Sequence, residues 1–150
     1  MMDLDRFIAA QRDVFAQVCA ELVDGEKRSH WMWFVFPQIA GLGASAMARR
    51  YGVEDLGEAR RYLAHPVLGS RLAKVTELML SWAGRRSAVA ILGPVDAVKF
   101  CSSMTLFELA TPALSSEAGR FGHALDAFCD GRRDERTIDM LKRLPARPAA

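Results

Sequence analysis

Apolar positions recur at helical spacing over most of the chain. The stretch from Asp3 to Val23 is the first example, and Asp24-Gly25 ends it. The clearest amphipathic pattern covers Pro66 to Trp82, where one apolar stripe lies opposite a charged face. The same spacing predicts five more helices, at 45–51, 55–63, 96–110, 116–129 and 134–144.

Two short apolar segments, 31–36 and 87–92, are too uniformly apolar for their hydrophobic period to distinguish a helix from a buried strand. We favour a helix for the first one because its surroundings are helical, and Ser29 can supply its N-cap. No run of alternating strands is present. The sequence therefore predicts a mainly α, single compact domain of about seven helices over residues 1–144, with residues 145–150 as a flexible C-terminal tail.

Composition narrows the class of protein. Hydrophobic residues make up 51% of the chain and charged residues 25%, which is typical of a packed globular domain. The net charge of +2 is too small to indicate binding to nucleic acid, and the four Arg-Arg pairs are dispersed. No stretch approaches the roughly 20 apolar residues of a membrane span, and no signal-peptide pattern is visible. We expect a cytoplasmic protein without a membrane partner, and the oligomeric state stays open.

The three cysteines, Cys19, Cys101 and Cys129, are odd in number and match no zinc-binding spacing. All three lie among apolar residues, so we expect free, buried thiols in a reducing cytoplasm. No two histidines have metal-ligand spacing either. The sequence therefore predicts neither a metal site nor a cofactor.

The helix predicted at 96–110 is apolar on nearly every side, which places it in the middle of the fold. Polar residues nevertheless interrupt it, namely Lys99, Ser102, Ser103 and Thr105. In one interpretation the hydroxyls bond to carbonyls one turn earlier while Lys99 reaches solvent. In the other they form the polar floor of a ligand site, where Asp96, Lys99 and Ser103 share one stripe.

The segment from Ser29 to Gln38 packs aromatic side chains between His30 and Gln38. Trp31 and Trp33 can belong to the core or form a wall against a nucleotide base or a sugar. Arg28 lies close enough in sequence to meet a phosphate. The glycines before Ser45 precede a helix, so this turn is either an ordinary one or a weak phosphate-binding loop.

Four segments together carry a recognisable signature: SHWMWFVFPQ at 29–38, LGAS at 42–45, YLAHPVLGSRL at 62–72 and KFCSSMTLF at 99–107. Through them the chain, over roughly residues 4–143, resembles the bacterial domain of unknown function 1810 family, whose members are sometimes labelled calpastatin. That family is in turn similar to YbiA- or NADAR-type domains, which act on ADP-ribose derivatives and cleave N-glycosidic bonds. The resemblance implies a YbiA-like helical fold with a pocket for a nucleotide-sugar-like small molecule.

Two functions are compatible with this resemblance. As a hydrolase of an ADP-ribose- or NAD-derived ligand, the domain would use Lys99 at the anomeric carbon and Asp96 or Glu108 as acid–base partner. The expected ligand-binding residues would be Arg28, His30, Trp31, Trp33, Gln38, Ser45, Ser102, Ser103 and Thr105. The alternative is a non-catalytic module that binds a small molecule or a protein.

Overall fold

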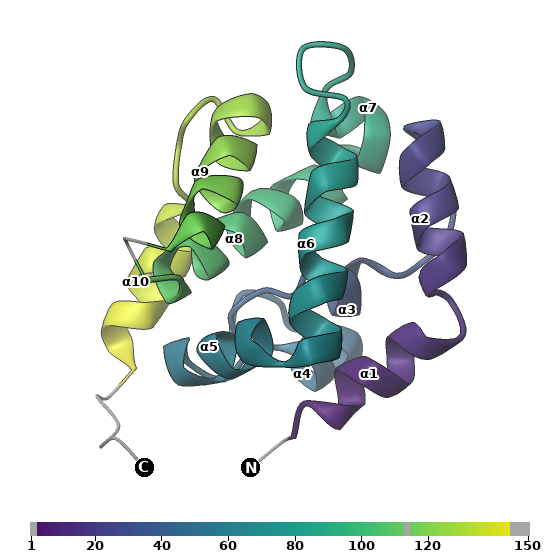
Figure 1. Cartoon of the computed structure of the whole chain (residues 1–150). Coiled ribbons are helices and arrows are strands. Elements are labelled where there is room, and N and C mark those ends of the chain that lie inside the picture. The colour runs from purple at the N-terminus through teal and green to yellow at the C-terminus, as the bar shows by residue number, and fades with distance from the viewer. Residues whose placement is uncertain (1–2, 113–114, 145–150) are drawn as a thin grey trace.

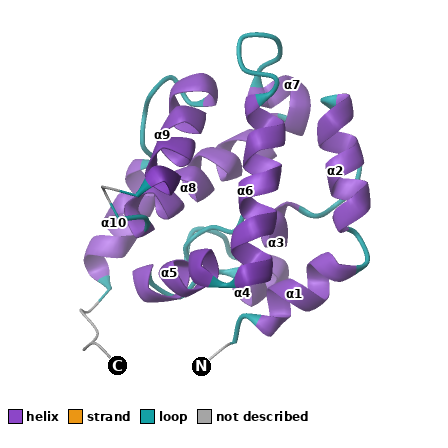
Figure 2. Ribbon diagram, in the orientation of Figure 1, coloured by secondary structure: helices purple, strands orange, loops and turns teal. Residues whose placement is uncertain are grey.

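The computed structural model describes residues 3–112 and 115–144, and all of its regular elements are helical (Figures 1 and 2). The described helices are α1 (Asp5–Arg12), α2 (Phe15–Asp24), α3 (Met32–Val35), α4 (Ala46–Tyr51), α5 (Leu56–Ala64), α6 (Pro66–Leu80), α7 (Ala88–Leu92), α8 (Pro94–Ala110), α9 (Ser116–Phe128) and α10 (Glu135–Arg143). The prediction of a mainly α, compact single domain is confirmed. None of these helices is long and apolar enough to cross a membrane.

The described helices number ten rather than about seven, for two reasons. Both ambiguous apolar segments are helical, as α3 and α7. In addition, the stretch predicted as one helix from Asp3 to Val23 is divided at Asp13 into α1 and α2. The buried Gln11 lies just before this division, and its amide nitrogen donates to the Phe34 carbonyl 2.7 Å away. The end of α1 therefore packs against α3 at the point where the chain leaves α1 and begins α2.

Helix α8 occupies the middle of the fold, as its apolar composition predicts. It packs against α5, α7, α9 and α10. Figure 1 shows it running behind α6, with α9 and α10 on one side and α2 on the other. Phe100, Met104 and Phe107 are fully buried along it, whereas Val95 and Val98 near its start are exposed.

Side-chain caps explain several helix boundaries. Asp55 accepts a hydrogen bond from the Glu58 amide at the start of α5. His65 ends α5 and begins α6, and its Nδ1 accepts from the amides of Val67 and Leu68. The prediction that Ser29 caps α3 is wrong, because Trp31 occupies the N-cap position without a side-chain bond.

A buried ion pair anchors the segment between α4 and α5. The Arg6 guanidinium lies 2.8 Å from Glu58 Oε1 and also donates to the carbonyls of Arg50 and Gly52. Beside it, Ile39 and Val53 form an isolated parallel β-bridge. These contacts bring residues 38–40 and 50–53 side by side.

The expectation of three free thiols is wrong. Cys101 on α8 and Cys129 just after α9 form a disulfide, and Cys19 is the free cysteine. Helices α8 and α9 pack along each other, so their cysteines meet although 28 positions separate them in sequence. The half-exposed Cys19 has a raised thiol pKa because of burial, which the nearby Lys74 only partly offsets.

Candidate functional site

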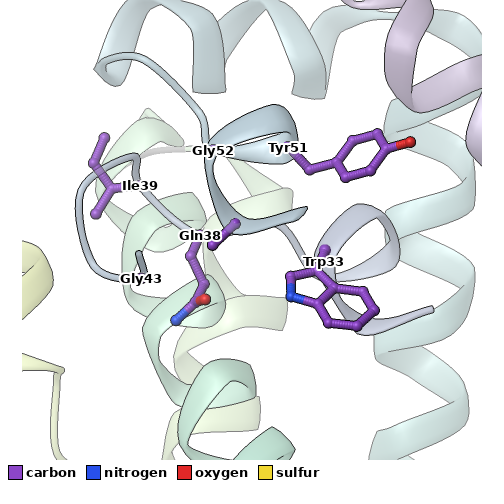
Figure 3. Close-up of a pocket in the computed structure, with 7 residues that line it drawn as sticks. Trp33, Gln38, Ile39, Gly43, Tyr51 and Gly52 are labelled. Atoms are coloured by element: carbon purple, nitrogen blue, oxygen red, sulfur yellow. The ribbon is translucent and has the colours of Figure 1, made fainter. Parts of the chain in front are cut away.

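A shallow pocket lies where the loop after α3 meets α4 (Figure 3). Its lining consists of Trp33, Gln38, Ile39, Gly43, Ala48, Tyr51 and Gly52. The space within it, including the part open to solvent, is about 240 Å³. Two of the lining residues, Trp33 and Gln38, are expected site residues.

Gln38 forms a hydrogen bond through its main chain but none through its side chain in the described structure. Its carbonyl accepts from the Val53 amide at 2.8 Å, and the Ala40 amide donates to the Val53 carbonyl at 2.8 Å. Among the described residues, the half-buried Gln38 side chain has no hydrogen-bond partner. An amide offers both a donor and an acceptor, so this group is available to a ligand.

Lys99 of α8 reaches the aromatic segment. Its ammonium lies 5.0 Å from the centroid of the Trp33 ring, within the range of a cation–π contact. The same ammonium lies 3.6 Å from Asp96 Oδ1, while Lys27 Nζ lies 2.9 Å from Asp96 Oδ2. Two lysines therefore share one carboxylate and leave a net positive charge beside Trp33.

Glu21 of α2 organises the loop that leads into α3. This fully buried carboxylate accepts from the backbone amides of Arg28 and Ser29, from the Ser29 hydroxyl, and from the side chains of Gln17 and Trp31. Burial alone would raise the pKa of Glu21, but these hydrogen bonds outweigh it and lower the pKa to about 2. The carboxylate thus stays ionised and holds the loop in place.

Several expected ligand residues have other roles. Trp31 is buried and donates its indole N–H to Glu21. Arg28 is exposed and pairs with Asp24 and Glu26, and hydrogen bonding to Asp24 is the main cause of its raised pKa. His30 is exposed and outside the pocket lining. Ser45 caps α4 by accepting from the Ala48 amide at 3.1 Å.

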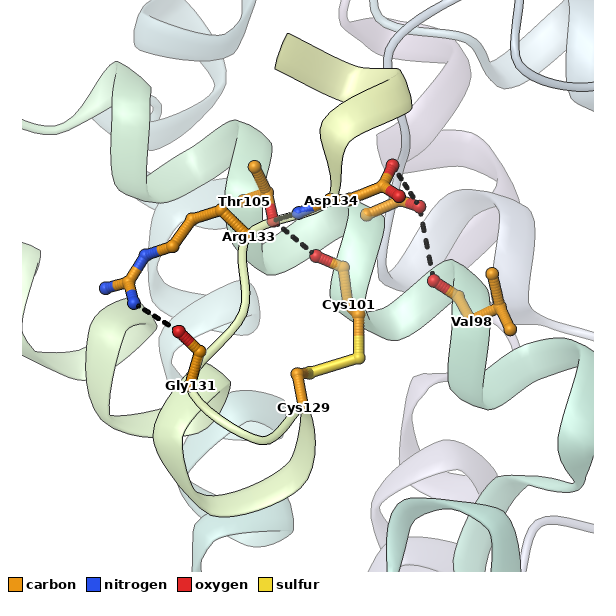
Figure 4. Close-up of a disulfide and its surroundings, with 8 residues drawn as sticks. Val98, Cys101, Thr105, Cys129, Gly131, Arg133 and Asp134 are labelled. Carbon is orange, nitrogen blue, oxygen red and sulfur yellow. Dashed lines mark hydrogen bonds between the residues drawn. A yellow bond between two sulfur atoms is a disulfide. The ribbon is translucent and has the colours of Figure 1, made fainter.

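The hydroxyls of α8 serve mainly to hold the segment that precedes α10 (Figure 4). Ser102 Oγ bonds to Asp134 Oδ2 at 2.9 Å and to the Val98 carbonyl at 3.2 Å. Thr105 Oγ1 donates to the Cys101 carbonyl and accepts from the Asp134 amide. The interpretation in which these hydroxyls bond one turn earlier is therefore correct for Ser102 and Thr105.

Glu108 and Ser103 also lie outside the pocket lining. Both carboxylate oxygens of Glu108 accept from Arg133, at 2.8 Å and 2.6 Å. Ser103 is fully buried, and its hydroxyl has no partner among the described residues. The expected site is thus divided. Lys99, which pairs with Asp96, contacts the Trp33 ring. Ser102, Thr105 and Glu108 instead hold the segment that contains Arg133 and Asp134.

Sequence reasoning missed the second wall of the pocket, which is formed by Gly43, Ala48, Tyr51 and Gly52. Gly43 belongs to the glycine turn before Ser45, but Ala48, Tyr51 and Gly52 carry no motif of their own, and the bridge between Ile39 and Val53 brings their segment next to Gln38. The organising role of Glu21 was also missed. A single acidic residue on the apolar side of a predicted helix was the available signal, because such residues are rarely buried without partners.

No three metal-ligating side chains gather among the residues that the structure describes. The pocket lining offers aromatic stacking and one free amide, and the positive charge of Lys99 lies outside this lining, against the Trp33 ring.

Comparisons with known proteins place the chain in a family. The family model described as "Protein of unknown function (DUF1810)" matches residues 1–141. The crystal structure of the conserved hypothetical protein Rv1873 from Mycobacterium tuberculosis is 46% identical, with 95% of this chain and 98% of that chain covered and a TM-score of 0.88. No curated protein sequence matches the chain. The chain belongs to the DUF1810 family of proteins of unknown function.

Proposed function

We propose that this domain binds a small nucleotide-sugar-like ligand of the ADP-ribose class in the pocket at Trp33 and Gln38. The observation that carries the proposal is the Gln38 side-chain amide, which has no hydrogen-bond partner in the described structure and lines a pocket next to Trp33. The choice of ligand class rests on the resemblance of the signature segments to YbiA- and NADAR-type domains.

Each group has a distinct role in this proposal. The Trp33 ring supplies an aromatic surface for a base or for the apolar face of a sugar. The Gln38 amide hydrogen-bonds a base edge or a ribose hydroxyl. Lys99 attracts the anionic part of the ligand. Its contact with Asp96 is 3.6 Å, longer than the 2.9 Å contact made by Lys27, so Lys99 is the lysine that a phosphate would recruit.

The charge arrangement favours binding over hydrolysis. Cleavage of an N-glycosidic bond generally needs a carboxyl group that can donate or accept a proton at the reacting atoms. Glu108 is engaged by Arg133, and Asp96 is shared by Lys27 and Lys99. Hydrolysis through Asp96 and Lys99 is the second candidate, since Lys99 contacts the Trp33 ring and Asp96 pairs with Lys99.

Isothermal titration calorimetry with ADP-ribose tests the binding. Lys99→Ala and Gln38→Ala should each weaken binding by about tenfold, the cost of one charge-assisted or well-placed hydrogen bond. Lys74→Ala is the matched control, because Lys74 is an exposed lysine on α6 outside the pocket lining. Absence of binding by the unmodified protein at millimolar ADP-ribose would contradict the proposal, and so would an equal loss in the Lys74 variant.

Turnover is measured separately by incubating the protein with NAD and quantifying released nicotinamide. Under the favoured function no release above the spontaneous rate is expected. Release that disappears in both Lys99→Ala and Asp96→Asn would instead establish the hydrolase.

A further inference from the structure

Helix α10 rests directly on the loop that borders the pocket. Arg136 Nη2 donates to the Leu42 carbonyl at 2.9 Å. A side chain at Gly41 would place its Cβ 2.9 Å from Met140 Cε, so α10 lies close to the loop backbone there. The next glycine of this loop, Gly43, lines the pocket. The position of α10 therefore bears on the shape of the pocket.

The chain that enters α10 is fixed to α8 by one covalent bond and several polar contacts. The disulfide between Cys101 and Cys129 lies at the start of this connection, and the hydrogen bonds of Ser102 and Thr105 to Asp134 lie at its end (Figure 4). Each polar contact contributes only about 1 kcal/mol when solvent can compete for it. The disulfide is therefore the strongest single attachment in this connection.

This disulfide joins two residues near the surface of the domain. Both Cys101 and Cys129 are partly exposed rather than buried in the core. A dithiol reductant can attack it by thiol–disulfide exchange: two protein thiols form, and the two reductant sulfurs leave joined as a disulfide. Oxidation by a disulfide-bearing partner reverses the same exchange, so the bond can respond to a redox couple.

We infer that the Cys101–Cys129 disulfide is a redox-sensitive latch that sets the position of α10 and, through Arg136 and Leu42, the order of the loop that lines the pocket. This loop is defined as residues 39–45. In the oxidised protein α10 holds it in place through Leu42, next to the β-bridge between Ile39 and Val53. In the reduced protein α10 and the loop are released together. The effect on ligand binding rests on the proposed function, whereas the effect on the loop does not.

Hydrogen–deuterium exchange with mass spectrometry tests the latch without a ligand. The experiment uses the full chain with Cys19→Ser, so that dithiothreitol acts on one disulfide and no other cysteine. On reduction, amides of the loop 39–45 should exchange about tenfold faster at short labelling times, at which amides on the buried side of α6, which exchange only through global unfolding, remain protected in both forms. Cys101→Ser combined with Cys129→Ser should reproduce the reduced pattern without reductant.

Arg136→Ala separates the latch from a general loss of stability. This variant keeps the disulfide, yet exchange of the loop should rise in the oxidised protein as well. Three results would overturn the inference: an unchanged loop after mass spectrometry shows complete reduction, an equal rise in α6 and the loop, or a purified protein in which all three thiols are free.

Titration with ADP-ribose before and after reduction then links the latch to the pocket. Binding should be at least several-fold weaker in the reduced protein, and Arg136→Ala should show the same loss when oxidised. If ADP-ribose binds neither form while the loop still responds to reduction, the latch stands and the proposed function fails. Equal binding to both forms despite a released loop would remove the link to this ligand site.

Discussion

The Trp31 indole nitrogen donates a 3.0 Å hydrogen bond to Glu21 Oε1, and solvent reaches neither side chain. This bond ties α2 to Trp31, the residue just before α3, and α3 carries Trp33 at the pocket. The carboxylate satisfies five donors without an ion-paired lysine or arginine among the described residues. Its ionisation is consequently coupled to folding.

Glu21→Gln should lower the free energy of unfolding at neutral pH by about 2 kcal/mol, because a neutral amide replaces charge-assisted acceptors. The folded-state pKa of Glu21 is lowered to about 2 from its ordinary value of 4.5. Its stabilisation is therefore complete above pH 4.5 and is lost as the pH falls towards 2. Urea denaturation of both proteins from pH 7 to pH 2.5 measures the difference.

The difference between wild type and Glu21→Gln should shrink steadily below pH 4.5. A difference that stays constant down to pH 2.5 would show that the carboxylate does not titrate in this window.

Breaking the disulfide should destabilise the domain. In the chain-entropy description, a cross-link that spans 28 positions contributes about 3–4 kcal/mol to the free energy of unfolding. Guanidinium denaturation of a Cys19→Ser protein, with and without dithiothreitol, measures this contribution. The Cys101→Ser and Cys129→Ser double variant should match the reduced protein, and a loss below about 1 kcal/mol would contradict the prediction.

Removal of one partner from the buried ion pair should be costly. Arg6→Met leaves the Glu58 carboxylate, which is 1% exposed, without its cation, and the expected loss is about 3–5 kcal/mol. Adding Glu58→Gln should recover part of this loss, because the uncompensated charge is removed. Arg60→Ala, at an exposed position on α5, serves as the control and should change stability by less than about 0.5 kcal/mol. Thermal denaturation of the four proteins decides between these outcomes.

Gly69 allows α6 to pass close to the end of α5. A Cβ at this position would overlap the backbone carbonyl oxygen of Leu63, which cannot move aside as a flexible side chain would. Gly69→Ala should therefore cost about 2–3 kcal/mol. Gly119→Ala is the matched control on α9, where a Cβ meets open space.

The control substitution should stabilise the protein by about 0.5–1 kcal/mol, because alanine restricts the unfolded chain and favours helix. Circular dichroism melting curves compare the two variants. Equal effects of the two substitutions would refute the steric role of Gly69.

Helix boundaries were predictable where a local cap decides them. Asp55 and the His65-Pro66 pair mark the limits of α5 in the sequence and in the structure. The division at Asp13 was not predictable, because no glycine or proline occurs there and the apolar period continues. The contact next to this division joins Gln11 to Phe34, a residue 23 positions away, and local patterns do not reveal such a contact.

The candidate site was predictable in part. The aromatic run that is followed by Gln38 predicted Trp33 and Gln38 as ligand-binding residues, and both line the pocket. The polar residues of α8 were correctly selected as unusual, but their partners are set by tertiary packing. The partner of Glu108, for example, is Arg133 on a segment that local patterns do not connect to α8. The pairing of Cys101 with Cys129 was missed for the same reason.

The polar contacts of α8 have a consequence for the uniqueness of the fold. A helix that is apolar on nearly every side gains similar burial at many angles of rotation about its own axis, because apolar contacts have no direction. Hydrogen bonds are directional, and a rotated helix would leave the Ser102 and Thr105 hydroxyls facing away from Asp134. These hydroxyls therefore select one angular register of the central helix, and with it the direction in which Lys99 extends.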